Sequence, residues 1–179
     1  AGGPVTLTDC RMTRFIMTLE DSCRLVLSAA EKARGGEVFV TKMPVIQIAD
    51  LARVMIDELA PQYGYSPDDM ELTEIGSKPG EKLYEELMSD EETRRTLELT
   101  EMFAVMPAFR SVYEDIAYDY DDIINTNVTD PYISSPENSM ELEELREYVL
   151  EHRLLDCYMR KAPLTPVGLA SISIQRRAA

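Results

Sequence analysis

The chain has 179 residues, a net charge of −15 and a hydrophobic fraction of 45%. This length and composition predict one globular domain with a real core. The negative charge argues against a nucleic-acid partner or an anionic membrane surface, since both require clustered basic residues. No apolar run reaches the roughly 18 residues that span a bilayer, so we expect no membrane partner.

The N-terminus and the cysteines indicate the cellular setting. The first residue is Ala rather than Met, which suggests a trimmed chain or a piece of a longer reading frame. No basic region followed by an apolar stretch marks a signal peptide. Three widely spaced cysteines favour a reducing compartment, so we expect a cytoplasmic protein. His152 is the only histidine, and no metal site is predicted.

The first residues of the chain predict a strand, a short apolar run and a helix, in that order. Residues 5–8 alternate as a strand does, and residues 15–17 form a short apolar run. Thr18 is the expected N-cap of a helix that runs to about Arg34 and closes at Gly35-Gly36. One face of this helix has the spacing of an amphipathic helix and comprises Leu19, Cys23, Val26, Leu27 and Ala30.

The middle of the chain alternates strands with helices. Strands are expected over residues 37–40 and 71–75. A helix is expected over residues 48–60, ended by Pro61, and a third from Glu81 to about Met88. The buried face of the 48–60 helix should comprise Ile48, Leu51, Ala52, Met55, Ile56 and Leu59. This alternation indicates an α/β layer with at least one parallel crossover.

The last part of the chain is less regular. Residues 102–106 predict a strand stopped by Pro107, and the acidic residues 112–122 predict a solvated loop. A final helix, capped by Asn138 or Ser139, should place Leu142, Leu145, Tyr148 and Val149 on its apolar face. Residues 156–179 lack periodicity, so we expect a poorly ordered tail.

Two polar segments about sixty residues apart carry the functional prediction. The first, Thr8 to Phe15, places Arg14 just before an apolar run. The second, Glu74 to Leu83, places Lys78 before a Pro-Gly turn and Glu81 in a first helical turn. A guanidinium and an ammonium suit a diphosphate, and a carboxylate suits ribose hydroxyls. We therefore expect these three side chains to gather around one nucleoside-diphosphate-shaped hollow.

Each of the three residues also has an ordinary interpretation. Arg14 is equally consistent with an ordinary surface or ion-paired arginine. Lysines such as Lys78 are common before turns. A carboxylate such as Glu81 stabilises a first helical turn by a few tenths of a kcal/mol without any ligand. The residues alone leave both interpretations open.

The order of the motifs resembles a known family. Thr-Asp-x-x-Met-Thr-Arg-Phe, Gly-Gly-Glu-Val-Phe-Val and Gly-x-Lys-Pro-Gly-Glu-Lys-Leu follow one another, and Tyr132-x-Ser134 precedes a Glu-Glu-Leu-Arg helix. This series, over roughly residues 4–154, is similar to the C-terminal half of the extended short-chain dehydrogenases/reductases of polysaccharide biosynthesis, such as inverting UDP-N-acetylglucosamine 4,6-dehydratases. The sequence departs from the family at Lys78, where arginine is usual, and a lysine loses the bidentate fork.

The resemblance implies an α/β fold. It would be the C-terminal part of a Rossmann-type enzyme, with the last parallel strands and helices and a small substrate-binding lobe. Residues 1–155 would form the nucleotide-sugar-binding portion, and residues 156–179 the tail. The implied roles are diphosphate binding by Arg14 and Lys78, and ribose binding by Glu81. NAD or NADP would be bound by an N-terminal part that is absent here, and the intact enzyme would be a homo-oligomer acting on a UDP-sugar.

The chemistry-bearing residues of such an enzyme are not in this sequence. It contains no G-x-G-x-x-G motif, and no tyrosine has a lysine four positions on. We therefore expect no catalytic and no cofactor-binding residue in this chain. In the intact enzyme the resemblance implies oxidation at C4, loss of water across C5–C6 and return of the hydride. Two alternatives remain open: a UDP-sugar 4-epimerase of the same family, and a stand-alone, non-catalytic binding or assembly module.

Overall fold

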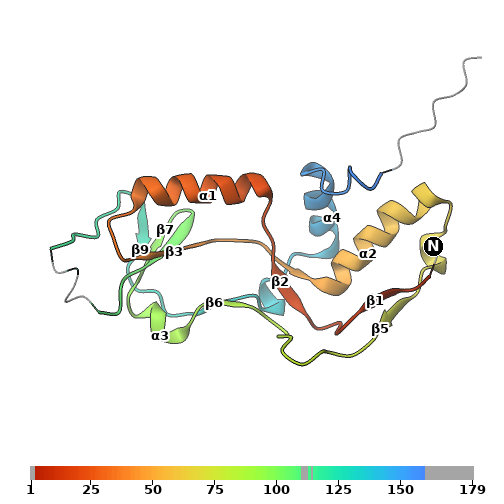
Figure 1. Cartoon of the computed structure of the whole chain (residues 1–179), viewed down its shortest axis with the longest axis horizontal. Coiled ribbons are helices and arrows are strands. Elements are labelled where there is room, and N and C mark those ends of the chain that lie inside the picture. Colours follow the sequence, from red (N-terminus) through yellow and green to blue (C-terminus); the bar gives the residue numbers. More distant parts are fainter. Residues whose placement is uncertain (1–2, 110–112, 114, 160–179) are drawn as a thin grey trace, which may run out of the picture.

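The computed structural model describes residues 3–109, 113 and 115–159, which form a mixed α/β fold (Figure 1). The α-helices of this described part are α1 (Leu19–Lys32), α2 (Ile48–Leu59), α3 (Asp90–Thr93) and α4 (Leu142–Glu151). The strands are β1 (Val5–Leu7), β2 (Thr13–Phe15), β3 (Val38–Thr41), β4 (Val45–Gln47), β5 (Leu72–Glu74), β6 (Glu86–Met88), β7 (Thr96–Leu99), β8 (Met102–Val105), β9 (Ile123–Asn125) and β10 (Tyr132–Ile133).

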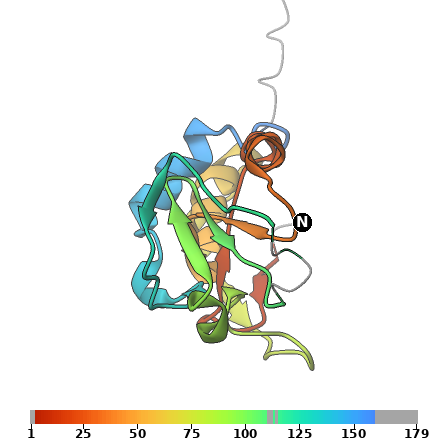
Figure 2. The ribbon, with the colours of Figure 1, turned by 90° about the vertical axis from the view of Figure 1, so that its left-hand side faces the viewer.

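One end of the molecule is an antiparallel sheet with the strand order β3-β8-β7-β9 (Figure 2). The tight β7–β8 connection and the apolar residues of β8 make this strand the centre of the sheet, and all four of its residues are buried. The core on one side of the sheet comprises Leu99, Met102, Ala104, Met106 and Tyr120. The expected strand at residues 102–106 is therefore confirmed.

The other end combines α2 and α4 with a parallel strand pair. β1 pairs with β5 in parallel, with Val5 opposite Leu72 and Leu7 opposite Glu74, and α2 lies between these strands in the chain. This arrangement confirms the expected parallel crossover. The core at this end comprises Ile46, Val54, Leu145, Val149 and Leu155. β2 and β4 pair antiparallel between the two ends and connect them (Figure 1).

Helix α1 begins where expected, but its C-cap is Ala33 rather than Gly35-Gly36, and its apolar face is exposed. Thr18 is the N-cap, and a capping box with Asp21 satisfies the first free backbone N–H groups. Leu25, on the side facing the sheet, packs against its core, and no residue of the helix is buried. The opposite face, with Leu19, Val26 and Leu27, lies in solvent. The sequence pattern located the apolar face correctly, but that face does not meet this core.

Helix α2 also has the expected limits, and its burial differs in detail. Val54 and Ile56 are its buried residues, and Val54 was not on the expected list. The other expected residues are half-buried, and four of them, Ile48, Leu51, Met55 and Leu59, pack against the core at this end. The chain continues past Pro61 as a short 3-10 helix over Ala60–Tyr63, because proline is tolerated at a helix start.

The prediction of a helix from Glu81 to Met88 is wrong. This segment is extended, and its last residues form β6, which pairs antiparallel with β10. The Thr13 N–H donates to the Leu83 carbonyl, and the Ser134 N–H donates to the Glu85 carbonyl. These long-range bonds use backbone groups that a helix would need, so tertiary pairing overrides local helix propensity.

Three further expectations need correction or lie partly outside the described residues. The N-cap of α4 is Glu141, which forms a capping box with Glu144, and not Asn138 or Ser139. Of the expected tail, residues 156–159 form turns that continue from α4, and residues 160–179 lie outside the described part. The acidic segment 112–122 is also described only in part.

Candidate functional site

The two polar segments lie side by side. β1 and β5 pair first, and the Ile75 N–H then donates to the Leu7 carbonyl at 2.9 Å. The contact ends where the Thr13 N–H donates to the Leu83 carbonyl, also at 2.9 Å. Residues nearly seventy positions apart are therefore brought into contact at both ends of the two segments.

Asp9 connects the two segments at their middle. Its buried carboxylate accepts hydrogen bonds from the Arg11 backbone N–H at 2.9 Å and from the Arg11 guanidinium at 2.9 and 2.7 Å. The Ser77 hydroxyl of the second segment donates to the same carboxylate at 3.3 Å. The hydrogen bonds from Arg11 hold the pKa of Asp9 well below its usual range. Asp9 is therefore a fixed anion that keeps the first segment in place.

Arg14 lies against the end of the second segment. Its Nη2 donates to the Lys82 carbonyl at 2.9 Å, and its Nη1 donates to the carbonyls of Thr13 at 2.6 Å and Leu83 at 3.3 Å. Glu85 is 3.5 Å from Nε. The guanidinium is therefore surrounded by protein acceptors, and a phosphate would have to replace the longer of these contacts.

Lys78 and Glu81 share one tight turn. The Glu81 carboxylate accepts the Lys78 backbone N–H at 2.7 Å, and the Glu81 N–H donates to the Lys78 carbonyl at 3.1 Å. Gly80 has a φ of 91°, a left-handed conformation that side chains disfavour. Both side chains are exposed, and no ion pair to the Lys78 ammonium is found among the described residues. No helix begins at this turn, so the expected helix N-terminus does not assist anion binding.

A buried polar pair positions Arg14, and the sequence prediction assigned it no role. Thr13 and Ser134 are both buried, and their hydroxyl oxygens are 3.2 Å apart. The Thr13 hydroxyl donates to the Ser134 carbonyl, while the Ser134 hydroxyl accepts the Glu85 N–H at 2.8 Å. These bonds connect β2 to both neighbouring segments. The signal was present, because both residues stand inside the motifs that carry the resemblance.

Tyr132 packs against the Phe15 end of β2. Its ring lies 4.8 Å from the Phe15 ring and 5.1 Å from the Phe103 ring, measured between centroids. Its hydroxyl accepts the Met43 N–H at 2.6 Å, and burial raises its pKa. Tyr132 is therefore part of the support for β2 and is not placed as an acid or base.

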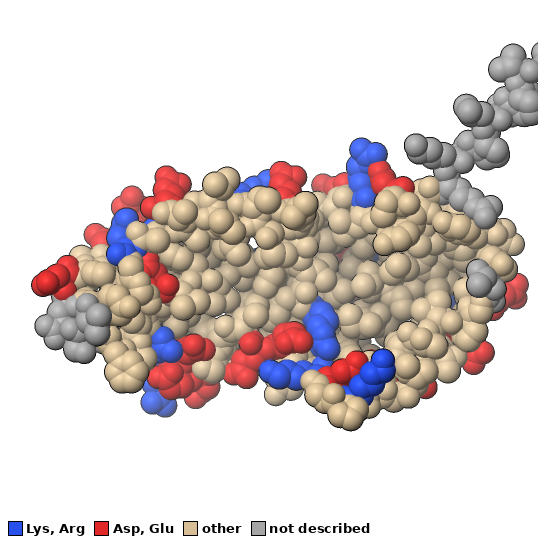
Figure 3. Space-filling view, in the orientation of Figure 1, with Lys and Arg blue, Asp and Glu red and all other residues tan. Residues whose placement is uncertain are grey.

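Charged residues gather at the edge where these segments lie. Figure 3 shows a group of Lys, Arg, Asp and Glu side chains at the lower edge, where the chain passes from β5 to β6 in Figure 1, in addition to those along the upper and left-hand edges. The middle of the same face carries few charged side chains. The edge therefore offers both cations and carboxylates, as a ligand with phosphates and hydroxyls requires.

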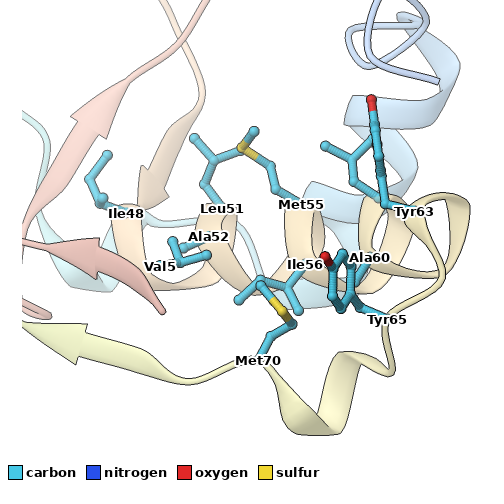
Figure 4. Close-up of a pocket in the computed structure, with 11 residues that line it drawn as sticks. Val5, Ile48, Leu51, Ala52, Met55, Ile56, Ala60, Tyr63, Tyr65 and Met70 are labelled. Carbon is cyan, nitrogen blue, oxygen red and sulfur yellow. The ribbon is translucent and has the colours of Figure 1, made fainter. Parts of the chain in front are cut away.

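The predicted residues do not line either described hollow. One hollow, of about 470 Å³, is apolar and lies along α2 (Figure 4). Its walls include Val5, Leu51, Met55, Tyr65 and Met70. The other, of about 270 Å³, lies between the start of α1 and the end of α4 and contains Asp21, Lys42, Tyr148 and His152. Arg14, Lys78 and Glu81 are not among the residues that line these two hollows, and a single hollow around the three side chains stays a prediction.

The described residues do not fit a dinucleotide cofactor. Such a cofactor needs a Gly-rich turn that leads from a strand into a helix. Gly35 and Gly36 lead from α1 into β3, the reverse order, while Gly76 and Gly80 lie between two strands. We therefore assign no step of a reaction to a cofactor on this chain.

One cluster brings together atoms of the metal-binding type. Atoms of Asp9, Cys10 and Glu74 lie within 4.8 Å of one another. Arg11 already neutralises Asp9, and the hydrogen bond to Glu74 raises the pKa of the Cys10 thiol. A thiol that resists ionisation and an already paired carboxylate are poor metal ligands. No metal is assigned.

Comparison with known proteins shows the family. The family model described as "Polysaccharide biosynthesis protein" matches residues 1–107, more than half of the chain. The chain therefore belongs to this family.

Individual relatives are consistent with membership of this family. The chain is 36% identical over 109 residues to the inverting UDP-N-acetylglucosamine 4,6-dehydratase of Campylobacter jejuni, covering 61% of this chain and 29% of that protein. It is 32% identical over 149 residues to the UDP-glucose 4-epimerase of Rickettsia canadensis, covering 83% of this chain and 41% of that protein. The solved structure of Pen from Bacillus thuringiensis superposes with a TM-score of 0.71 and 38% identity, over 85% of this chain and 42% of that one.

These relatives are longer than the chain, which spans less than half of each. A further relative, 56% identical over 106 residues, 59% of this chain and 32% of that protein, is named an uncharacterised membrane protein of Methanocaldococcus jannaschii. Within the described residues of this chain, no helix has the length and apolar character needed to cross a bilayer.

Proposed function

We propose that residues 1–155 form the nucleotide-sugar-binding portion of an NAD(P)-dependent 4,6-dehydratase that acts on UDP-N-acetylglucosamine. In this proposal the chain is the C-terminal part of a Rossmann-type enzyme. Arg14 and Lys78 bind the diphosphate, and Glu81 binds the ribose hydroxyls. The cofactor and the catalytic residues belong to a separate N-terminal portion. The contribution of this chain is to hold the nucleotide so that the sugar reaches the reacting groups.

The observation that carries the proposal is the pairing of the two polar segments. Arg14 contacts the carbonyls of Lys82 and Leu83, directly after the turn that holds Lys78 and Glu81. Arg14 thus lies against the residues that directly follow the turn of Lys78 and Glu81, which supports a shared site for two cations and one carboxylate. The family model matches residues 1–107, which contain all three side chains, and two relatives of the chain are named as enzymes that act on UDP-sugars.

The net charge of −15 does not oppose this ligand. A cation about 4 Å from a phosphate gains roughly 4 kcal/mol at an effective dielectric near 20. A surface carboxylate about 20 Å away costs roughly 0.2 kcal/mol in water, and salt screening reduces this about tenfold. Local contacts therefore outweigh the distant charges.

Isothermal titration of the chain with UDP-N-acetylglucosamine tests the proposal. Arg14→Ala should weaken binding by at least about tenfold, since it removes a charge-assisted contact of about 1.5 to 3 kcal/mol. Lys78→Ala should have a smaller effect, and Lys78→Arg, which restores a bidentate fork, should strengthen binding. Arg24→Ala on α1 is the control, because Arg24 is an exposed arginine paired only with nearby acids.

Arg14 also supports backbone carbonyls, so its removal must be separated from unfolding. Arg14→Lys keeps the charge and loses the fork, and thermal melts of both variants report whether the fold persists. Folded Arg14→Ala protein with unchanged affinity for the nucleotide sugar would refute the assignment of Arg14. Binding that Arg14→Ala and Arg24→Ala weaken equally would refute the site as a whole.

A UDP-sugar 4-epimerase is the second candidate. The match to the Rickettsia UDP-glucose 4-epimerase extends over 149 residues, against 109 for the Campylobacter dehydratase. The same three side chains would bind the same nucleotide, so affinity does not separate the two reactions. Product analysis of an intact enzyme does, because a dehydratase yields a 4-keto-6-deoxy sugar and an epimerase yields the C4 epimer.

A further inference from the structure

The guanidinium of Arg14 is occupied by protein acceptors at every nitrogen except Nε. Nη1 donates to the carbonyls of Thr13 at 2.6 Å and Leu83 at 3.3 Å. Nη2 donates to the Lys82 carbonyl at 2.9 Å and lies 3.7 Å from the Met12 sulfur. Within the described residues, Nε–H makes no hydrogen bond. It is therefore the donor that a ligand can use without breaking a bond from Arg14 to the backbone.

The side chain of Glu85 stands at this open position. Its Oε1 lies 3.5 Å from the Arg14 Nε, which is an ion pair but is longer than the roughly 2.7 to 2.9 Å of a charge-assisted hydrogen bond. The Arg14 side chain is 26% exposed and that of Glu85 is 42% exposed. Glu85 therefore neutralises Arg14 loosely, from the solvent side, at the place where a phosphate oxygen would bind.

The backbone of Glu85 is fixed while its side chain is not. The Glu85 N–H donates to the Ser134 hydroxyl at 2.8 Å, and the Glu85 carbonyl accepts the Ser134 N–H at 2.9 Å. Ser134 is fully buried, so these two bonds keep the residue beside β2. The ion pair to Arg14 is the one contact of the Glu85 carboxylate within the described residues. The carboxylate can therefore turn into solvent without disturbing the fold.

We propose that Glu85 is a displaceable counter-ion of Arg14. It neutralises the guanidinium in the free chain, and a phosphate of the ligand takes its place at Nε while the carboxylate turns into solvent. The inference rests on the proposed nucleotide-sugar site and concerns the regulation of that same site. Glu85 favours anionic ligands, because a neutral nucleoside brings no charge to replace the carboxylate. Since an exposed ion pair is weak, the carboxylate lowers affinity for a diphosphate by only roughly two- to fivefold.

Isothermal titration of the full chain with UDP tests the counter-ion. Glu85→Gln keeps the shape of the side chain and should tighten UDP binding by roughly two- to fivefold. Glu86→Gln is the matched control, because Glu86 is the next residue, is exposed and makes no ion pair within the described residues. It removes the same charge and should change the affinity by less than about 1.5-fold, since salt screens charges that are not in contact. Thermal melts check that both variants are folded.

A double-mutant cycle shows whether Glu85 acts through Arg14. In an Arg14→Ala background, Glu85→Gln should no longer tighten UDP binding. Equal tightening by Glu85→Gln and Glu86→Gln would overturn the proposal, because the effect would then be one of overall charge. Weaker binding by Glu85→Gln would also overturn it, since the carboxylate would then support the site.

The titrations separate this inference from the proposed function. UDP binding that depends on Arg14 but is unchanged by Glu85→Gln would refute the counter-ion role alone. No UDP binding by the wild-type chain or by folded Glu85→Gln would refute the proposed site together with its counter-ion.

Discussion

Helices α1 and α2 have similar lengths and similar sequence patterns, yet they are used differently. Both begin and end close to where the sequence predicts, and both carry an apolar face. The face of α2 packs partly on the core with α4, whereas the face of α1 lies in solvent. Periodicity therefore identifies an apolar face but does not say what covers it. Substitutions in the two helices and beside the charged edge test this difference in burial.

The largest expected effect on the free energy of unfolding is the difference between the same Val→Ala substitution in α2 and in α1. Val54→Ala in α2 removes two methyl groups from a side chain with no exposed area, and leaves a cavity. It should lower the free energy of unfolding by about 2 to 3 kcal/mol. Val26→Ala in α1 should change it by less than about 0.5 kcal/mol. Urea unfolding at low micromolar concentration measures both, and equal losses would show that the α1 face is buried in solution.

A smaller loss is expected at the buried hydroxyl pair. Thr13→Val keeps the shape of the side chain and leaves Ser134 without one hydrogen-bond partner. The cost should be about 1 to 2 kcal/mol of unfolding free energy. Thr129→Val, at an exposed threonine, is the control. If both variants melt alike, the pair does not hold β2 in place.

The N-cap of α1 should contribute less to the free energy of unfolding than the buried hydroxyl pair. Thr18→Ala removes the acceptor of the Asp21 N–H and should cost about 1 kcal/mol. Thr18→Ser keeps the hydroxyl and should restore most of the loss. Thermal melts compare the three proteins. Equal stability of Thr18→Ala and wild type would mean that α1 is held by other contacts.

The smallest expected change is one of pH dependence. The pKa of Asp9 is lower in the folded chain than the usual value near 3.9, so its ionised form stabilises the fold above about pH 4. This stabilisation is lost as the pH falls through the folded pKa. Asp9→Asn should therefore be less stable than wild type at neutral pH, and the difference should shrink in acid. A difference that is constant from pH 7 to pH 2 would contradict this.

The sequence predicted the local elements well and the long-range ones less well. The limits of α1 and α2 follow from Thr18, Pro61 and the apolar periodicity, all of which act within a few residues. The helix from Glu81 to Met88 failed because β10 and β2 compete for the same backbone groups. These partners are about fifty and seventy positions away in the chain, so no local signal reports them.

The candidate site shows the same division between local features, which the sequence predicted, and long-range contacts, which it did not. The sequence predicted Arg14, Lys78 and Glu81 as binding residues, and the structure brings the two segments that carry them into contact, while their role stays a prediction. It did not identify Thr13 or Ser134, whose hydrogen bonds position β2. Nor did it show that Arg14 already contacts several carbonyls. Such contacts depend on the final geometry, and residue type alone does not encode them.

The most direct test of the central claim is amide chemical-shift mapping with UDP, followed by uridine alone. We predict that UDP perturbs the amides of Arg14, Lys78 and Glu81 together, and that uridine, which lacks phosphates, perturbs Arg14 and Lys78 much less. Shifts confined to the apolar hollow along α2, or spread over unrelated faces, would contradict a nucleoside-diphosphate site at the charged edge.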